Sequence, residues 1–503
     1  MLATATTFTI DGVQSRRVNV EVDVRPGLPA FTIVGLGDTA VRESRERVRA
    51  AILNSGFEFP QRRITANLAP ASLRKAGPGF DAAIALGVLA ASGQLEPDAL
   101  GGVAVFGELS LSGGLRPAAG ALAVAEGARR SGLAGLVVSG AQAPEAALIS
   151  GLRVFGVSGL KGAVDAVTGR QVPPQAKAAV SAPADRGLDL ADVRGHAVPL
   201  LAVEVAAAGG HNLLFEGSPG TGKTMLARRI PSILPPMSLQ EALEVTRLHG
   251  IAGIHRGGLI AERPFRAPHH TISAAGLVGG GNPPRPGEAT LAHGGVLFLD
   301  ELSEFGRTAI EALRQPLEDG RVTIVRGQRS LSFPTRFMLV AATNPCPCGY
   351  AGVGDRCHCS ELDVVRYQRR LSGPLLDRMD LLVTVGRPSE TDLNSPPHTT
   401  SAQARVRVAQ ARERQRRRLA GTGASCNGEM DARTVQTRVH IGAQAQALLR
   451  TAYTAGTLSA RGRHRVLRVA QTLADMDGRD LVRGEDLLQA LAMRQRVSEA
   501  EGL

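Results

Sequence analysis

The chain has 503 residues, and its 58 lysines and arginines against 46 aspartates and glutamates give a formal net charge of +12. A hydrophobic content of 43% excludes an intrinsically disordered chain, and no apolar run approaches the ~18 residues of a membrane-spanning helix. Five cysteines exclude a disulfide scaffold, and the start of the chain lacks the basic and apolar regions of a secretory signal, so we expect a cytoplasmic protein.

The excess of basic over acidic residues favours a polyanionic partner such as DNA. A drift of composition toward arginine explains the choice of arginine over lysine, but it does not explain this excess. Aromatic residues make up only 3% of the chain and tryptophan is absent, which argues against a base-stacking platform. Arginine–phosphate contacts with weak sequence preference are therefore expected.

The first 168 residues alternate strand-like and helix-like patterns, which predicts an N-terminal α+β domain. Period-2 alternation predicts strands over Phe8–Ile10, Val18–Val24 and Phe31–Val34, and a helix with a basic outer face is expected over Asp38–Asn54. Residues 169–187 are rich in proline and alanine without periodicity, so they are predicted to be a linker.

A phosphate-binding loop of the form G-x-x-x-x-G-K-[ST] follows an apolar strand and opens a helical pattern, which is the context that this motif needs. Its residues are Gly217, Ser218, Pro219, Gly220, Thr221, Gly222, Lys223 and Thr224. Lys223 is expected to reach the β- and γ-phosphates of ATP, and Thr224 is expected to hold Mg²⁺. Only four residues of the chain are lysines, so a lysine at the position that requires one argues against an ordinary glycine-rich turn.

Two further apolar stretches end in polar residues. Val296–Leu299 leads into Asp300, a predicted Mg²⁺ ligand through water, and Glu301, which is expected to orient the attacking water. Phe337–Thr343 leads into Asn344, a predicted sensor of the γ-phosphate. Acidic residues also end buried strands, and asparagine often precedes proline in turns. Parallel strands, however, bring their carboxyl ends to one edge of a sheet, where ligands bind.

Loops and a hairpin interrupt this region. Two proline- and glycine-rich loops carry the basic side chains Arg263, Arg266, His269, His270 and Arg285. Arg321–Phe333 is predicted to form a β-hairpin whose turn contains Gly327. Both features are predicted either to contact DNA or to be ordinary surface structure.

Four of the five cysteines lie within fourteen residues, as Cys346, Cys348, Cys357 and Cys359. This density suits a tetrathiolate Zn²⁺ site, although the C-x-C spacing departs from the usual C-x₂-C knuckle. Reduced thiols in a loop are the alternative interpretation. Cys426 stands apart and is expected to be a free thiol.

The nucleotide-binding core is predicted to span residues 188–388, as an α/β domain with a parallel sheet. Residues 389–503 are predicted to form an α-helical lid. Seven arginines between 405 and 418 are expected either to form a solvated helix face or to contact phosphates. Two other arginines, Arg378 and Arg461, carry guanidinium groups that suit the charge developing on a transferring phosphoryl group.

The order of these motifs resembles the AAA+ ATPases of the magnesium-chelatase-like branch, and more specifically the bacterial YifB/ComM family. Besides the phosphate loop, the resemblance is carried by Gly209–Leu214, Arg266–Ile272, Gly294–Leu302, Leu313–Gly320, Asn344–Gly349, Leu371–Arg378 and Leu458–Gly462. It implies a homo-oligomeric ring, a hexamer, in which Arg378 acts as the arginine finger of the neighbouring site and Arg461 is a second sensor carried by the lid. In such a ring the basic side chains of the two loops are expected to face a central pore.

The resemblance also implies an activity, a motor that hydrolyses ATP with Mg²⁺ and drives branch migration of DNA as a helicase during natural transformation. A chelatase-type ATPase that remodels a protein partner is the alternative. The N-terminal segment resembles the Lon-protease-like domain at Arg74–Asp81 and Gly107–Pro117. Gly79 stands at the nucleophile position and no lysine follows Pro117 where the base is expected, which argues against an ATP-dependent peptidase.

Overall fold

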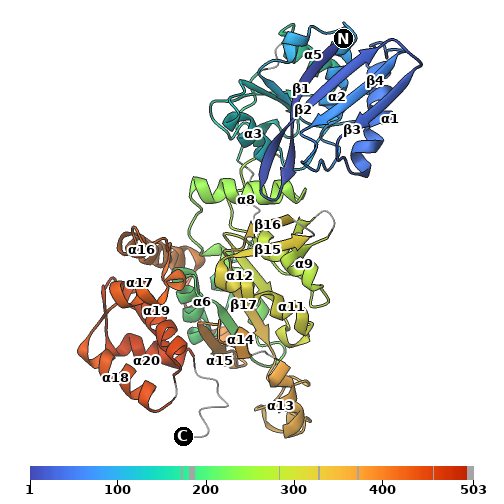
Figure 1. Ribbon diagram of the computed structural model, residues 1–503. Helices are drawn as coiled ribbons and strands as arrows, with labels where there is room; N and C mark the ends of the chain where they lie inside the picture. The colour runs from blue at the N-terminus through green and yellow to red at the C-terminus, as the bar shows by residue number, and fades with distance from the viewer. Residues whose placement is uncertain are drawn as a thin grey trace.

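The computed structural model describes residues 1–171, 174–180, 187–255, 257–281, 284–326, 329–370, 373–456 and 458–494 (Figure 1). The predicted hairpin turn at 327–328, parts of the predicted linker and the end of the predicted lid at 495–503 lie outside these residues. A seven-stranded sheet, a five-stranded sheet and a helical C-terminal region follow one another along the chain, which confirms the predicted mixed α/β class.

The N-terminal region is a mixed β-sheet with helices packed on it (top of Figure 1). Its strands among the described residues lie in the order β3 (Ala30–Val34), β4 (Arg63–Ala69), β2 (Gln14–Arg25), β1 (Leu2–Asp11), β5 (Val103–Val105), β8 (Gly135–Ser139) and β9 (Arg153–Val157). The helices are α1 (Thr39–Asn54), α2 (Asp81–Ala91), α3 (Ala121–Arg130), α4 (Ala143–Ala146) and α5 (Leu160–Thr168). The three predicted strands and the predicted helix are confirmed, and Asp38 caps α1 by accepting from the amide of Val41 at 3.0 Å.

The central region is built on a sheet whose strands are all parallel. The order in the described residues is β11 (Phe265–Arg266), β14 (Val296–Leu299), β17 (Met338–Thr343), β10 (Leu213–Glu216) and β18 (Leu381–Thr384). Every residue of β14 and β17 is buried, as expected for a parallel sheet covered on both faces. Leu213 and Phe215 pack toward the helical C-terminal region, whereas Leu214 packs on the opposite face.

Helices and two small hairpins surround this sheet. The helices are α6 (Ala197–Gly209), α7 (Lys223–Arg229), α8 (Leu239–Ile251), α9 (Ala274–Val278), α10 (Glu288–Leu291), α11 (Arg307–Ala312), α12 (Arg314–Asp319), α13 (Glu361–Arg370) and α14 (Gly373–Leu376). The hairpins are β12 (Gly279–Gly280) with β13 (Arg285–Pro286), and β15 (Arg321–Arg326) with β16 (Arg329–Pro334). The second of them is the predicted hairpin, which is thereby confirmed.

The C-terminal region is helical and packs against α6. It contains α15 (Glu390–Asn394), α16 (Ser401–Arg418), α17 (Ala432–Arg438), α18 (Ala443–Thr454), α19 (Ala460–Met476), α20 (Gly484–Ala492) and the short strands β19 (His440–Ile441) and β20 (Leu481–Val482). Polar contacts fix α16 on α6, because Arg407 pairs with Glu204 at 2.6 Å and Gln415 donates to the carbonyl of Ala208 at 3.0 Å. Within the described residues, none of the helices combines the length and the apolar character that crossing a bilayer requires.

The N-terminal region rests on the central region through α8 and the β15–β16 hairpin (Figure 1). Gly120, before α3, donates its amide to the carbonyl of Gly250 at 3.0 Å, and Arg247 of α8 pairs with Glu126 of α3 at 3.0 Å. At the hairpin, Val13 from the β1–β2 turn packs against a small apolar cluster that includes the buried Phe333.

This interface contains a buried carboxyl group, Glu145 of α4, which is 0% exposed and accepts from the amide of Leu122 at 3.2 Å. Burial raises the pKa of Glu145 to about 7, although the amides of Leu122 and Gly257 oppose the rise. Because the folded protein holds this proton up to a higher pH than the unfolded chain, stability decreases as pH rises from the ordinary glutamate range to about 7. Above that pH the ionised group costs about 3 kcal/mol.

We expect the substitution Glu145→Gln to raise the free energy of unfolding by about 3 kcal/mol at pH 8 and by much less at pH 5. Calorimetric unfolding of the full chain at the two pH values measures this difference. Glu96→Gln, at an exposed position of the same region, is the matched control and should change neither value. An equal effect of Glu145→Gln at both pH values would contradict the assignment.

Candidate active site

The phosphate-loop sequence connects β10 to α7, as the motif predicts. Its glycines are required by conformation and space. Gly220 and Gly222 have φ of +77° and +93°, which other residues rarely adopt, and a Cβ atom on Gly217 would lie 2.2 Å from the carbonyl oxygen of Val385. The loop is thus closely packed against the end of β18 and turns tightly before α7.

Lys223 points back into this loop. Its ammonium group donates to the carbonyls of Gly217 at 2.5 Å and Ser218 at 2.8 Å, and to the side-chain oxygen of Asn344 at 3.1 Å. Burial lowers the pKa of Lys223, while the nearby carboxylates of Asp300 and Glu301 oppose the shift. A buried cation held among carbonyl oxygens is well placed to bind an anionic phosphate.

Thr224 and Asp300 form the neighbouring pair. The Thr224 hydroxyl donates to the Asp300 carboxylate at 2.7 Å, although the two residues are 76 positions apart. A hydroxyl and a carboxylate at this distance are the hard oxygen ligands that Mg²⁺ uses when it also binds phosphates. The donor set therefore fits the expected magnesium ion.

Glu301 lies just beyond β14 and has an unusual backbone conformation. Its φ of +53° is the only positive value for a residue other than glycine in the described part of the chain. Its amide donates to the Asp300 carboxylate at 3.1 Å, and its side chain is 57% exposed. The His270 ring nitrogen Nδ1 lies 3.6 Å from the Glu301 carboxylate, so the strained turn presents this carboxylate at the surface beside a histidine.

The structure therefore brings together the residues that the sequence singled out on three strands. Lys223, Thr224, Asp300, Glu301 and Asn344 all follow the carboxyl ends of β10, β14 and β17 at one edge of the parallel sheet. The place of His270 beside Glu301 was not predicted. The feature that could have indicated it is β11, which precedes His270. Because β11 is a further parallel strand, its carboxyl end also lies at this edge of the sheet.

Arg378 and Arg461 lie away from this group. Arg378 precedes β18 and pairs with Glu318, and the amide of Asn212, at the start of β10, bonds Asp380 at 3.2 Å. These contacts are at the amino ends of the strands, opposite the phosphate loop. Burial lowers the pKa of Arg378, and the positive charges of Arg314 and Arg461 lower it further, so the two predicted arginines are neighbours.

A cleft between the central region and the C-terminal helices contains both arginines. Its volume is about 1740 Å³, and its basic lining includes Arg378, Arg461, Arg465 and Arg468. Arg465 lies 3.8 Å from the buried carboxylate of Asp380, which connects α19 to the start of β18. The cleft is a large, open and arginine-rich surface at the amino edge of the sheet.

Two of the arginines that are expected to face a pore are bonded within the subunit. Arg263 is bonded to the carbonyls of Pro235 at 2.7 Å and Gly294 at 2.6 Å. Arg266 forms a bidentate pair with Glu288, with distances of 2.6 and 2.8 Å. Their guanidinium groups therefore fix loops within the subunit, and the position of these residues relative to a pore stays a prediction.

The arginines of α16 divide in the same way. Most of them bind the protein itself, since Arg407 pairs with Glu204 and Arg418 pairs with the buried Asp475 at 2.6 Å. Arg416 and Arg417 are each 77% exposed, and within the described part of the chain each forms its ion pair with Glu413. The helix is therefore mainly a packing element with an exposed basic end, rather than a uniform solvated face.

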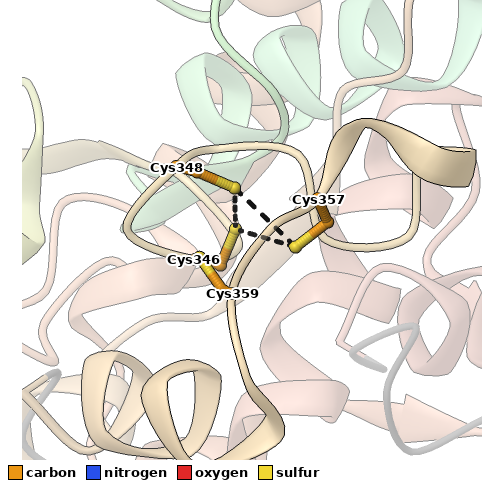
Figure 2. A group of neighbouring side chains, drawn as sticks. All are labelled: Cys346, Cys348, Cys357 and Cys359. Atoms are coloured by element: carbon orange, nitrogen blue, oxygen red, sulfur yellow. Dashed lines mark hydrogen bonds between the residues drawn. The ribbon is translucent and has the colours of Figure 1, made fainter.

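The four clustered cysteines converge on one point in the loop after Asn344 (Figure 2). Their sulfur atoms all lie within 4.8 Å of one another, and Cys346 is buried. The Cys346 sulfur is 3.3 Å from that of Cys348 and 3.8 Å from that of Cys357. Cys426 is buried elsewhere, beneath α6 and α16, as a free thiol.

The N-terminal region has no room for a serine nucleophile at Gly79. A Cβ atom there would lie 2.4 Å from the ring of Phe106. Lys75, four residues earlier, is fully buried and donates to the carbonyl of Pro70. The packing at Gly79 agrees with the absence of a serine–lysine dyad.

Comparison with known proteins covers each of these regions. The family described as magnesium chelatase, subunit ChlI, matches residues 189–393, the family described as subunit ChlI of Mg-chelatase matches 20–142, and the ChlI C-terminal family matches 398–494. The chain is similar to the competence protein ComM of Haemophilus influenzae, with 40% identity over 97% of this chain and 96% of that protein.

Two further relatives have similar coverage. The uncharacterised protein YifB of Escherichia coli is 40% identical over 96% of this chain and 95% of its own length. An uncharacterised protein of Mycobacterium tuberculosis is 42% identical over 98% of this chain and 99% of its own length. With identity of this level over nearly the whole length, the chain belongs to the YifB/ComM family of magnesium-chelatase-like AAA+ proteins.

Proposed function

We propose that this protein is an ATP-hydrolysing ring motor that acts on DNA, as a branch-migration helicase in recombination during natural transformation. The observation that carries the proposal is the separation of two half-sites on one sheet. Phosphate- and magnesium-binding groups stand at the carboxyl edge, and an arginine cleft stands at the amino edge. Phosphoryl transfer needs both halves, because the arginine must stabilise the charge on the same phosphate that the other half binds.

At the carboxyl edge, each group has one role. Lys223 binds the β- and γ-phosphates, while Thr224 and Asp300 hold Mg²⁺, which neutralises charge on the phosphates when it is bound. Glu301 orients the attacking water and takes its proton, and Asn344 contacts the γ-phosphate. We also assign Zn²⁺ to the four clustered cysteines as a second, structural metal.

At the amino edge, Arg378 and Arg461 serve the nucleotide of the neighbouring subunit. Lys223 follows the carboxyl end of β10, whereas both arginines line the cleft at the amino edge of the sheet, so we infer that they do not reach a phosphate bound in their own subunit. Head-to-tail packing places this cleft over the phosphate loop of the next copy, and repetition of that contact by rotation closes a ring, which we take to be a hexamer. Arg378 is then the arginine finger, and Arg461 is a sensor that acts from the same side.

DNA as the substrate is supported by charge and by kinship. The chain carries a net charge of +12, and the exposed Arg416 and Arg417 extend the basic surface beside the cleft. A relative of nearly equal length is named as a competence protein. The reduced cysteines and the use of ATP suit the cytoplasm as the place of action.

One alternative has a specific observation in its favour. The matching families are named for a magnesium-chelatase subunit, so an ATPase that remodels a protein partner is the second candidate. An ATPase that remodels a protein partner does not need the excess of basic over acidic residues. A peptidase is disfavoured because the ring of Phe106 occupies the space that a serine side chain at Gly79 would need.

Stimulation of ATP hydrolysis by DNA separates the two candidates. We expect single-stranded or branched DNA to raise the ATPase rate several-fold at low salt. Binding should weaken linearly in log affinity against log salt, as release of counterions requires. Steady-state ATPase and DNA binding, measured across a salt series, test both expectations.

The control for this experiment is Lys223→Ala, which should keep salt-sensitive DNA binding and lose hydrolysis. A rate that does not respond to any DNA, together with no salt-sensitive binding, would remove DNA as the substrate. That result would favour the remodelling ATPase.

A further inference from the structure

The sulfur atoms of the cysteine cluster have the spacing of ligands around one metal ion. The Cys348 sulfur lies 3.7 Å from that of Cys357, and the Cys346 sulfur lies 3.3 Å from that of Cys348 and 3.8 Å from that of Cys357. Four thiolates at about 2.3 Å from a tetrahedral Zn²⁺ are separated by about 3.8 Å. A disulfide requires about 2.05 Å between its sulfurs, so the separations exclude disulfides and match those of ligands around one zinc ion.

The chemistry of the donors selects the ion. Four thiolates around one centre favour zinc over the hard cations, which need oxygen ligands. An iron–sulfur cluster distributes its cysteines over several iron atoms and needs a wider cavity than sulfurs that all lie within 4.8 Å. The amide of Ala351 donates to the Cys346 sulfur at 3.2 Å, which stabilises a thiolate at that position.

The first pair of cysteines is continuous with the nucleotide site. Cys346 is two residues beyond Asn344, and the turn is closed by the amide of Gly349, which donates to the carbonyl of Cys346 at 3.0 Å. A Cβ atom on Gly349 would lie 2.6 Å from Cδ of Pro219 and 3.8 Å from the side chain of Asn344. The backbone of this turn therefore lies directly against the phosphate loop.

The second pair is connected to the same site from the other side. Cys359 leads into α13, whose Tyr367 is 4% exposed and hydrogen-bonded to Ser303. Ser303 in turn bonds the hydroxyl of Thr343, at the end of β17, at 2.7 Å. A metal that binds both cysteine pairs thus joins two segments, one that directly follows β17 and one that contacts the end of β17 through Ser303.

We propose that Cys346, Cys348, Cys357 and Cys359 bind one Zn²⁺ ion and that this ion holds Gly349 against Pro219, so that zinc occupancy sets the affinity of the phosphate loop for ATP. The inference rests on the proposed binding of ATP at residues 217–224. Without the metal, the two cysteine pairs are free to separate and Gly349 loses its fixed place. A displacement of about 1 Å near a phosphate site can cost on the order of a hundredfold in rate.

The first experiment measures zinc and nucleotide affinity in the full-length protein. We expect one zinc per chain by elemental analysis of the wild type and of the control Cys426→Ala, and less than half of that in Cys348→Ser. Removal of zinc with a chelator should weaken binding of a fluorescent ATP analogue by about tenfold or more, and added Zn²⁺ should restore it.

A second variant does not depend on the folding of the cysteine mutant. Gly349→Ala keeps all four ligands, but its added methyl group meets Pro219, and its φ of +87° disfavours any side chain. It should therefore retain one zinc per chain and bind the ATP analogue more weakly. Unchanged ATP affinity in this variant would overturn the coupling between the two sites.

The remaining outcomes are separable. A zinc-free wild type with four reactive thiols would overturn the metal site, and unchanged ATP affinity after zinc removal would overturn its influence on the phosphate loop. Lys223→Ala should contain one zinc and bind no ATP. If the wild type with full zinc also binds no ATP, the proposed nucleotide site fails while the zinc stoichiometry stands.

Discussion

Replacing Glu301 with glutamine should lower the ATPase rate by at least about a hundredfold while ATP still binds. Glutamine has the size of glutamate and can adopt the same backbone, whose φ is +53°, so the turn after β14 should keep its shape. It cannot take the proton of the attacking water. Asp300 and Thr224 are unchanged, and the nucleotide with its magnesium should therefore remain bound.

Glu304→Gln is the matched control, because Glu304 is an exposed carboxylate on the same turn. Its ATPase rate should equal that of the wild type. Nucleotide affinity and single-turnover hydrolysis, measured on both variants, separate loss of chemistry from loss of binding. If Glu301→Gln keeps a rate within a few-fold of the wild type, Glu301 is not the base.

Replacing Arg378 with alanine should lower the ATPase rate by about a thousandfold, because its guanidinium group is proposed to stabilise charge on the neighbour's γ-phosphate. ATP affinity should change much less, since Lys223 and the phosphate loop are intact. The loss should be partly reversed by mixing with Lys223→Ala, a second inactive variant. A Lys223→Ala subunit supplies Arg378 to a neighbour that has Lys223, and random mixing completes about a quarter of the interfaces.

Three measurements complete this test. Each variant alone should be inactive, the equimolar mixture should regain activity, and Arg307→Ala should behave as wild type, because Arg307 is exposed and pairs with Glu311 on the same helix at 3.1 Å. Activity that is absent from the mixture, although both variants assemble, would place Arg378 outside the neighbour's site.

The nucleotide site could be predicted from the sequence because each of its parts is local. Lys223 and Thr224 belong to one loop, and Asp300 and Asn344 each follow an apolar stretch. Because the carboxyl ends of parallel strands lie at one edge of a sheet, the residues that follow these stretches are expected to meet there. The convergence of the four cysteines was foreseeable for the same reason, since all of them lie in one short segment.

The arginines could not be predicted in this way. Whether a guanidinium group faces a partner or an internal carboxylate depends on residues far away in the chain, as the pairs of Arg266 with Glu288 and Arg407 with Glu204 show. The position of Arg461 beside Arg378 depends on how the C-terminal helices pack on the sheet. No local sequence pattern shows how these helices pack. A motif that is defined by residue spacing alone can be found without knowing the packing.

The β15–β16 hairpin has a consequence for how the molecule can be divided. A two-stranded hairpin is marginally stable alone, and one face of this hairpin, with Val322 and Phe333, packs against Val13 from the other end of the chain. A truncation that begins after the linker would expose these side chains to water and leave an apolar, aggregation-prone patch. The N-terminal Val13 is therefore part of the hairpin's own apolar cluster, and we expect a chain without the N-terminal region to be less stable than the full chain.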